Sequence, residues 1–259
     1  MRKICHIRCN DKYWETLNVY TRVKSNPYYN YYIKIIDLWN KYLKIDHLSF
    51  RKHIRDMMLN NIINKNYFDI ILESDQHCEK YLNNNKFEDT LFFQQDDDDI
   101  FLGIPPLEEM SDGINIFNYS FIDPLGSRRK RGYKNRKFGF DKPTHTIQSN
   151  HCLIYNQHTT VDLLSHKMYQ ADHTYYNKLI KKYTCKIFNS PISIQVYHLH
   201  SISLWKAQYN RSLQALDYTK DNNFLYFVDN YIKGLDEVYL ENKKIPLFKE
   251  MYSLYKYLL

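Results

Sequence analysis

The chain has 259 residues, a length at which one α/β domain can bury a sizeable hydrophobic core. Its hydrophobic fraction of 44% and aromatic fraction of 16% exclude a globally disordered protein. The formal net charge of +7 indicates an anionic partner, and the absence of any run near the roughly 18 apolar residues of a membrane span predicts no transmembrane segment.

The first hundred residues are predicted to alternate strands and helices. Residues 4–8 form a short, partly apolar run that indicates a first strand. Over residues 31–61 apolar side chains recur at spacings of three and four, which predicts amphipathic helices with a break near Asp46. Two short apolar runs, over residues 67–72 and 90–93, are typical of buried parallel strands. This part of the chain therefore indicates an α/β fold.

The remainder of the chain continues the same pattern. Residues 111–141 contain most of the glycines and predict a hairpin or loop excursion. Residues 147–155 predict a strand, residues 161–182 one or two helices, and residues 192–200 alternate as a strand does. From Phe224 onward the pattern is helical and rich in aromatic residues, which predicts a flanking helical segment.

Four consecutive aspartates, Asp96, Asp97, Asp98 and Asp99, follow the predicted strand over residues 90–93. A solvated acidic turn is the alternative, but such a turn would not need the apolar pair Ile100 and Phe101 directly after it. Neighbouring buried carboxylates raise one another's pKa, and a hard cation removes that conflict. We therefore expect Mn²⁺ or Mg²⁺ here, together with the phosphate oxygens of a nucleotide, at a strand end where open α/β sheets bind ligands.

His198 and His200 lie at the end of the last predicted strand. Strand alternation would place both side chains on one face, and imidazole is a common further ligand of a carboxylate-bound metal. A structural role for either histidine is the alternative. We expect His198 to contribute more to metal affinity than His200.

Asp172 precedes the helical run that contains Leu179 and Ile180. Aspartate is a frequent N-cap residue, so Asp172 could simply begin this helix. A carboxylate directed into a cleft could instead be the general base that deprotonates an acceptor hydroxyl. Both interpretations remain open at the level of sequence.

A basic segment lies between residues 128 and 137, where seven of ten residues are Lys or Arg. It contains Arg128, Arg129, Lys130, Arg131, Lys134, Arg136 and Lys137. We expect this loop to hold the donor diphosphate or a charged acceptor, although a solvated loop is the alternative. Nucleic acid is not expected as a partner, because the basic residues crowd into one loop instead of spreading along a groove.

Together these features resemble a glycosyltransferase of the GT-A type, and most specifically the rhamnosyltransferase family with its related small sugar transferases. The resemblance rests on the strand that runs into the aspartates, on residues 147–150, on Ala171, Asp172 and His173, and on His198 followed by Ser203. Gln94 and Ala171 depart from the family pattern, which has an arginine and an acidic residue at these places.

The resemblance implies a GT-A-like mixed, mostly parallel sheet flanked by helices in a single domain over residues 1–259. Residues 1–95 would form the donor-nucleotide half, residues 96–205 the metal and acceptor half, and residues 206–259 a helical C-terminal flank. The implied metal ligands are Asp96, Asp98 and His198, and the implied base is Asp172. For the donor nucleotide, the expected contacts are Asp96, Asp97, Arg8 at the end of the first strand, and Arg128 and Arg131 of the basic segment.

The expected function is therefore that of a metal-dependent glycosyltransferase. It would move a sugar from a nucleoside diphosphate sugar to a hydroxyl of a glycan or another acceptor. A metal-dependent nuclease or nucleotidyltransferase is one alternative, and a non-enzymatic interaction protein with solvated aspartates is another. The odd number of cysteines, five, suits reduced thiols, so we expect a cytoplasmic protein.

Overall fold

The computed structural model describes residues 2–8, 27–73, 75–84, 90–126, 138–141, 153–156, 181–201, 204–205, 208–209 and 216–259. These residues form two compact units. The first unit draws on Met1–Asn10, Met58–Ser120 and Phe140–Gln195, and the second on Asp11–Met57, Phe121–Gly139 and Val196–Leu259. The single catalytic domain expected from the sequence stays a prediction.

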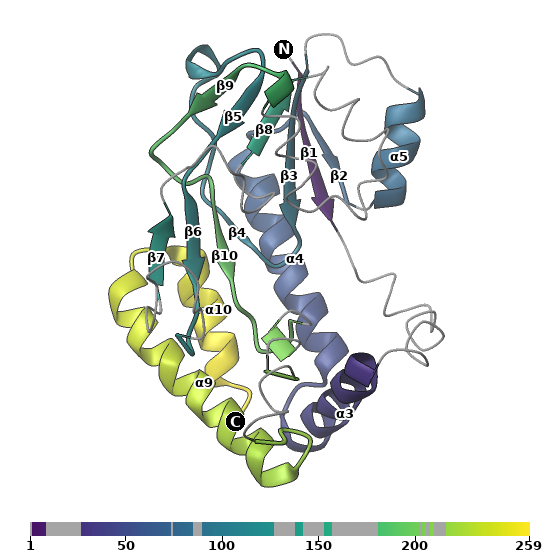
Figure 1. The fold of residues 1–259 in the computed structure, drawn as a ribbon, viewed down its shortest axis with the longest axis vertical. Coiled ribbons are helices and arrows are strands. Elements are labelled where there is room, and N and C mark those ends of the chain that lie inside the picture. Colours follow the sequence, from purple (N-terminus) through teal and green to yellow (C-terminus); the bar gives the residue numbers. More distant parts are fainter. Residues whose placement is uncertain are drawn as a thin grey trace. The chain divides into compact units, whose positions relative to one another are not determined.

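A six-stranded sheet in the order β2-β1-β3-β8-β5-β9 is the centre of the first unit (Figure 1). Its strands are β1 (Arg2–Arg8), β2 (Ile70–Leu72), β3 (Thr90–Asp96), β5 (Ile114–Ile116), β8 (Leu153–Asn156) and β9 (Cys185–Ile187). In this sheet β8 runs opposite to the other strands, because it is antiparallel to both of its neighbours. The α/β fold class is thereby confirmed, whereas the GT-A type stays a prediction.

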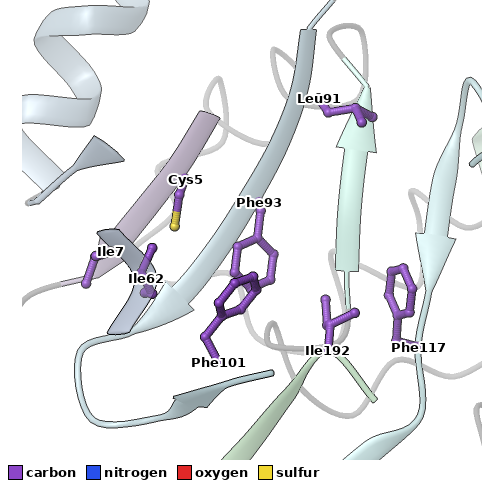
Figure 2. Close-up of a cluster of buried hydrophobic side chains, with 8 residues drawn as sticks. All are labelled: Cys5, Ile7, Ile62, Leu91, Phe93, Phe101, Phe117 and Ile192. Carbon is purple, nitrogen blue, oxygen red and sulfur yellow. The ribbon is translucent and has the colours of Figure 1, made fainter. Parts of the chain in front are cut away.

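Side-chain alternation along β1 and β3 buries both faces of this sheet. Ile4 and Phe92 point to the face that packs on Cys78 of α5 (Asp75–Asn84). Cys5 and Phe93 point to the other face, in a cluster with Ile62, Phe101, Phe117 and Ile192 (Figure 2). Burial on both faces is what short, continuously apolar strands indicate, and it explains why the strand prediction for residues 90–93 succeeded.

The acidic run leads from β3 into the second sheet, which has the order β4-β10-β6-β7. These strands are β4 (Ile100–Phe101), β6 (Tyr119–Ile122), β7 (Phe138–Asp141) and β10 (Ser193–Val196). β4 and β10 are antiparallel, with Ile100 opposite Ile194. The strand expected over residues 192–200 therefore ends at Val196, which corrects the prediction for residues 197–200.

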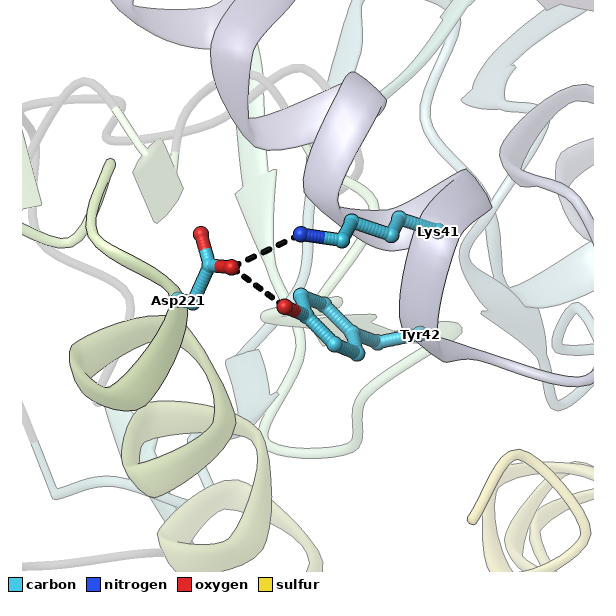
Figure 3. A network of polar contacts seen from close by, with 3 residues as sticks. All are labelled: Lys41, Tyr42 and Asp221. Carbon is cyan, nitrogen blue, oxygen red and sulfur yellow. Dashed lines mark hydrogen bonds and ion pairs between the residues drawn. The ribbon is translucent and has the colours of Figure 1, made fainter.

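The helices α3 (Pro27–Tyr42), α9 (Asp221–Asn242) and α10 (Pro246–Lys256) belong to the second unit. Asp221, at the start of α9, accepts a 2.8 Å hydrogen bond from Lys41 Nζ and another from the Tyr42 hydroxyl (Figure 3). An acid in the first turn of a helix is also favoured by the helix dipole. These contacts join α9 to the last turn of α3.

The predicted break near Asp46 is confirmed, because α3 ends at Tyr42 and α4 (His47–Lys65) follows it. Asp46 is the N-cap of α4, since its Oδ1 accepts a hydrogen bond from the Ser49 backbone N–H at 2.9 Å. The indole N–H of Trp39 donates to the carbonyl of Ile45 at 2.8 Å and thereby closes the connection between the helices.

Most of the helix predicted over residues 161–182, and the first residues of the strand predicted over 147–155, lie outside the described residues. The helical segment predicted from Phe224 onward is confirmed by α9 and α10. Among the helices that the structure describes, none combines the length and the apolar character needed to cross a membrane.

Gly234 in the middle of α9 is expected to tolerate no side chain. An added Cβ would lie 1.9 Å from the carbonyl oxygen of Pro124, which is backbone and cannot rotate away. We expect Gly234→Ala to lower the free energy of unfolding by about 3 kcal/mol, although alanine is the better helix former by roughly 1 kcal/mol. Urea denaturation measures this effect. Leu240→Ala on the same helix, at a side chain that is 71% exposed, is the control and should change stability by less than about 0.5 kcal/mol.

Candidate functional site

The acidic run forms a tight turn at the carboxyl end of β3 in the first unit. The backbone N–H of Asp99 lies 3.4 Å from the carbonyl oxygen of Asp96, which closes the turn before β4. Asp97 and Asp99 are buried, with 4% and 1% of their surface exposed, whereas Asp96 and Asp98 are partly exposed. The alternative of a fully solvated acidic turn therefore does not describe these residues.

Gln95 brings a neutral polar group into this turn. Its side chain is 1% exposed, and its Nε2 donates a 2.7 Å hydrogen bond to the carbonyl oxygen of Asp99. The amide oxygen Oε1 of Gln95 is buried and has no hydrogen-bond partner within the described part of the chain. A buried oxygen beside clustered carboxylates suits a hard cation, whose preferred ligands are oxygens. Sequence analysis missed Gln95, although a glutamine on the core face of an apolar strand is a usable signal.

Arg8 is the residue beside Asp96 in the sheet. The parallel register of β1 and β3 aligns Arg8 with Asp96, and it aligns His6 with Gln94. Both strands end at this point, so a basic residue and the first aspartate occupy the same carboxyl edge of the sheet. This arrangement brings together two of the residues predicted to contact the donor nucleotide.

His198 and His200 lie side by side in the second unit. They are 0% and 1% exposed, and their ring centroids are 4.5 Å apart. They follow β10 in a turn closed by a hydrogen bond from the Ser201 N–H to the His198 carbonyl at 2.9 Å. The expectation that the two rings share a location is met, but a turn and not strand alternation brings them together.

One tyrosine contacts both imidazoles. The hydroxyl of Tyr255, a fully buried residue of α10, lies 3.1 Å from Nδ1 of His198 and 2.9 Å from Nδ1 of His200. Because Nδ1 and Nε2 lie on different sides of an imidazole ring, the two Nε2 atoms are directed away from this hydroxyl. The sequence offers no signal for Tyr255, which is one of 25 tyrosines and is far from both histidines along the chain.

The surroundings keep His200 neutral. Burial lowers the pKa of His200 well below its usual 6.5, and the nearby His198, Arg51 and His47 lower it further. The hydroxyl of Tyr32 donates a 2.8 Å hydrogen bond to the carbonyl oxygen of His200. Since the neutral imidazole is the form that binds metals, His200 is in the protonation state of a ligand at neutral pH.

The carboxylates and the histidines thus belong to different units, and each group meets the chemical requirements of a metal ligand separately. Three predicted residues, Arg128, Arg131 and Asp172, lie outside the described residues. Comparison of the chain with protein-family models, with curated proteins and with solved structures found no match.

Proposed function

We propose that this protein is a metal-dependent glycosyltransferase of the GT-A type that uses a nucleoside diphosphate sugar as donor. The observation that carries the proposal is the buried acidic turn at the carboxyl end of β3, in a sheet whose strands run mostly parallel. Ligands of α/β sheets bind at this edge. The resemblance described from the sequence implies a mostly parallel sheet and an acidic motif after a strand, and both features are present.

The proposed protein ligands of the metal are those that the resemblance implies, Asp96, Asp98 and His198. Carboxylate oxygens and a neutral imidazole nitrogen are both common ligands of a divalent metal.

A bound Mn²⁺ or Mg²⁺ would neutralise the charge of the leaving nucleoside diphosphate. In this proposal Arg8, beside Asp96 at the sheet edge, contributes positive charge toward the same diphosphate. Arg128 and Arg131 would add to it from the basic segment, and Asp172 would accept the proton of the acceptor hydroxyl. The roles of Arg128, Arg131 and Asp172 are proposed from the sequence alone, because these residues lie outside the described part of the chain.

Thermal denaturation with defined ligands tests the proposal. The protein is heated alone, with Mn²⁺, and with Mn²⁺ plus UDP, GDP, CDP or dTDP. A ligand at a hundred times its Kd adds about 2.7 kcal/mol of stability, which corresponds to an increase in Tm of about 5 °C for a chain of this size. We expect this increase for at least one nucleoside diphosphate, and only when Mn²⁺ is present.

Two further results decide between the proposal and its alternatives. Release of the nucleoside diphosphate from the matching nucleotide sugar, in the presence of Mn²⁺, supports a glycosyltransferase. Cleavage of an oligonucleotide with Mn²⁺, without any response to nucleotide sugars, would replace the proposal with a nuclease. No stabilisation by Mn²⁺ under any condition would favour an interaction protein.

A further inference from the structure

Gln95, near the carboxyl end of β3 in the first unit, is a polar residue on an apolar face of the sheet. Strand alternation places its side chain on the same face as Phe93, and the register of β1 and β3 places Ile7 beside it. Both neighbours belong to the apolar cluster that also contains Phe101 (Figure 2). These side chains cannot hydrogen-bond a carboxamide. The acidic turn, which follows Gln95 directly, is the adjoining polar element.

A hydrogen bond to the turn fixes the orientation of the Gln95 carboxamide. The group that lies 2.7 Å from the carbonyl oxygen of Asp99 must be the amino group Nε2, because a backbone carbonyl can only accept. The amide nitrogen and oxygen are thereby distinguished without ambiguity. From standard bond lengths, Oε1 lies about 2.3 Å from Nε2, and therefore within about 5 Å of the Asp99 carbonyl oxygen. The amide oxygen is thus held at the turn.

This oxygen is an acceptor in a place rich in acceptors. Oε1 of Gln95 is buried and has no hydrogen-bond partner within the described part of the chain. Asp97 and Asp99 are 4% and 1% exposed, and ionised carboxylates can only accept hydrogen bonds. Buried polar groups are almost always satisfied, so an exception indicates a ligand, an ion or a water. A hard divalent cation fits best, because it binds carboxylate and carboxamide oxygens together.

We propose that Oε1 of Gln95 is a ligand of the divalent metal at the acidic turn, beside carboxylates of the turn. The inference rests on the proposed function and adds a ligand that the resemblance does not imply. A neutral oxygen binds the metal without adding to the repulsion among four aspartates in the metal-free protein. The hydrogen bond from Nε2 to Asp99 orients this oxygen, as hydrogen bonds commonly orient metal ligands.

Gln95→Met tests the proposal by removing both polar atoms while nearly keeping the length of the side chain. The affinity of the 259-residue chain for Mn²⁺ alone, measured by titration calorimetry, should fall by at least about 10-fold, the lower end of the effect of losing a group that only orients a ligand. Unchanged Mn²⁺ affinity in this variant would overturn the inference.

Gln95→Glu distinguishes a ligand from a residue that only braces the turn. Glutamate keeps an oxygen for the metal but loses the hydrogen bond to the Asp99 carbonyl. Its added negative charge should lower the Tm of the metal-free protein. It should bind Mn²⁺ at least as tightly as the wild type, and Mn²⁺ should raise its Tm by more than that of Gln95→Met. Equal losses of Mn²⁺ affinity in Gln95→Met and Gln95→Glu would contradict the role as a ligand.

Gln94→Met is the matched control. Gln94 is the preceding residue of β3 and is 2% exposed, but its side chain lies on the opposite face, where Nε2 is 3.4 Å from Nδ1 of His6. The same substitution in the same strand should leave Mn²⁺ affinity unchanged. A loss equal to that of Gln95→Met would show that disturbance of β3, and not removal of a ligand, lowers the affinity.

The inference and the proposed function can fail separately. Mn²⁺ binding that depends on Gln95, without any turnover of a nucleotide sugar, would refute the glycosyltransferase and support the ligand. Turnover of a nucleotide sugar with wild-type Mn²⁺ affinity in Gln95→Met would refute the ligand alone. Absence of Mn²⁺ binding by the wild type would overturn both.

Discussion

Asp98→Asn is expected to abolish Mn²⁺-dependent nucleotide binding and to lower Mn²⁺ affinity by at least about 100-fold. This estimate follows because even partners that only orient a metal ligand contribute 10-fold to 100-fold, and Asp98 is proposed to be a ligand itself. The fold should survive the change. Asp98 is partly exposed and is flanked by Asp97 and Asp99, so removing its charge relieves repulsion when no metal is bound.

Calorimetric titration with Mn²⁺ and thermal denaturation of the metal-free protein measure the two effects. Asp112→Asn removes the same charge from an exposed residue of the same unit and should leave Mn²⁺ affinity unchanged. Retained Mn²⁺-dependent nucleotide binding in Asp98→Asn would refute the assignment of the metal to this turn. A large loss of stability in metal-free Asp98→Asn would mean that the carboxylate has a structural role.

The metal-free protein is expected to lose stability between pH 6.5 and about pH 3 because of His47. Burial, and then the charge of Arg51, lower the pKa of His47 from 6.5 to about 3, while the His200 backbone and Asp46 oppose this shift. Between these pH values the unfolded state binds a proton that the folded state does not. The free energy of unfolding therefore falls as the pH falls, and the contribution of His47 is complete above pH 6.5. The total loss is about 5 kcal/mol, at about 1.4 kcal/mol per pH unit.

Urea denaturation at several pH values, with wild-type protein and His47→Gln, isolates this contribution from that of the carboxylates. The variant should lose less stability than the wild type over this range, because glutamine takes up no proton. His53→Gln, at an exposed residue of the same helix, should retain the wild-type pH dependence. Equal pH dependence of wild type and His47→Gln would show that the buried imidazole does not resist protonation.

Local pattern was sufficient to predict several elements of the fold. Short apolar runs predicted β2 and the centre of β3, because the side chains of buried strands are mostly apolar, but the run predicted over residues 67–72 begins three residues before β2. The 3.6-residue period predicted α3 and α4 with a break near Asp46, and the structure shows that Asp46 is the N-cap of α4. The strand assigned to residues 197–200 was wrong because alternating apolar residues also occur in a buried turn, where Leu199 is fully buried between two histidines.

By itself, the sequence determined that an acidic turn follows a buried strand. The apolar residues directly before and after the aspartates form the buried strands β3 and β4, so the turn between them depends on adjacent residues alone. Only the tertiary structure decided which residues far apart along the chain come together within each unit. Tyr255 reaches His200 across 55 residues, and the antiparallel direction of β8 depends on strands paired far along the chain.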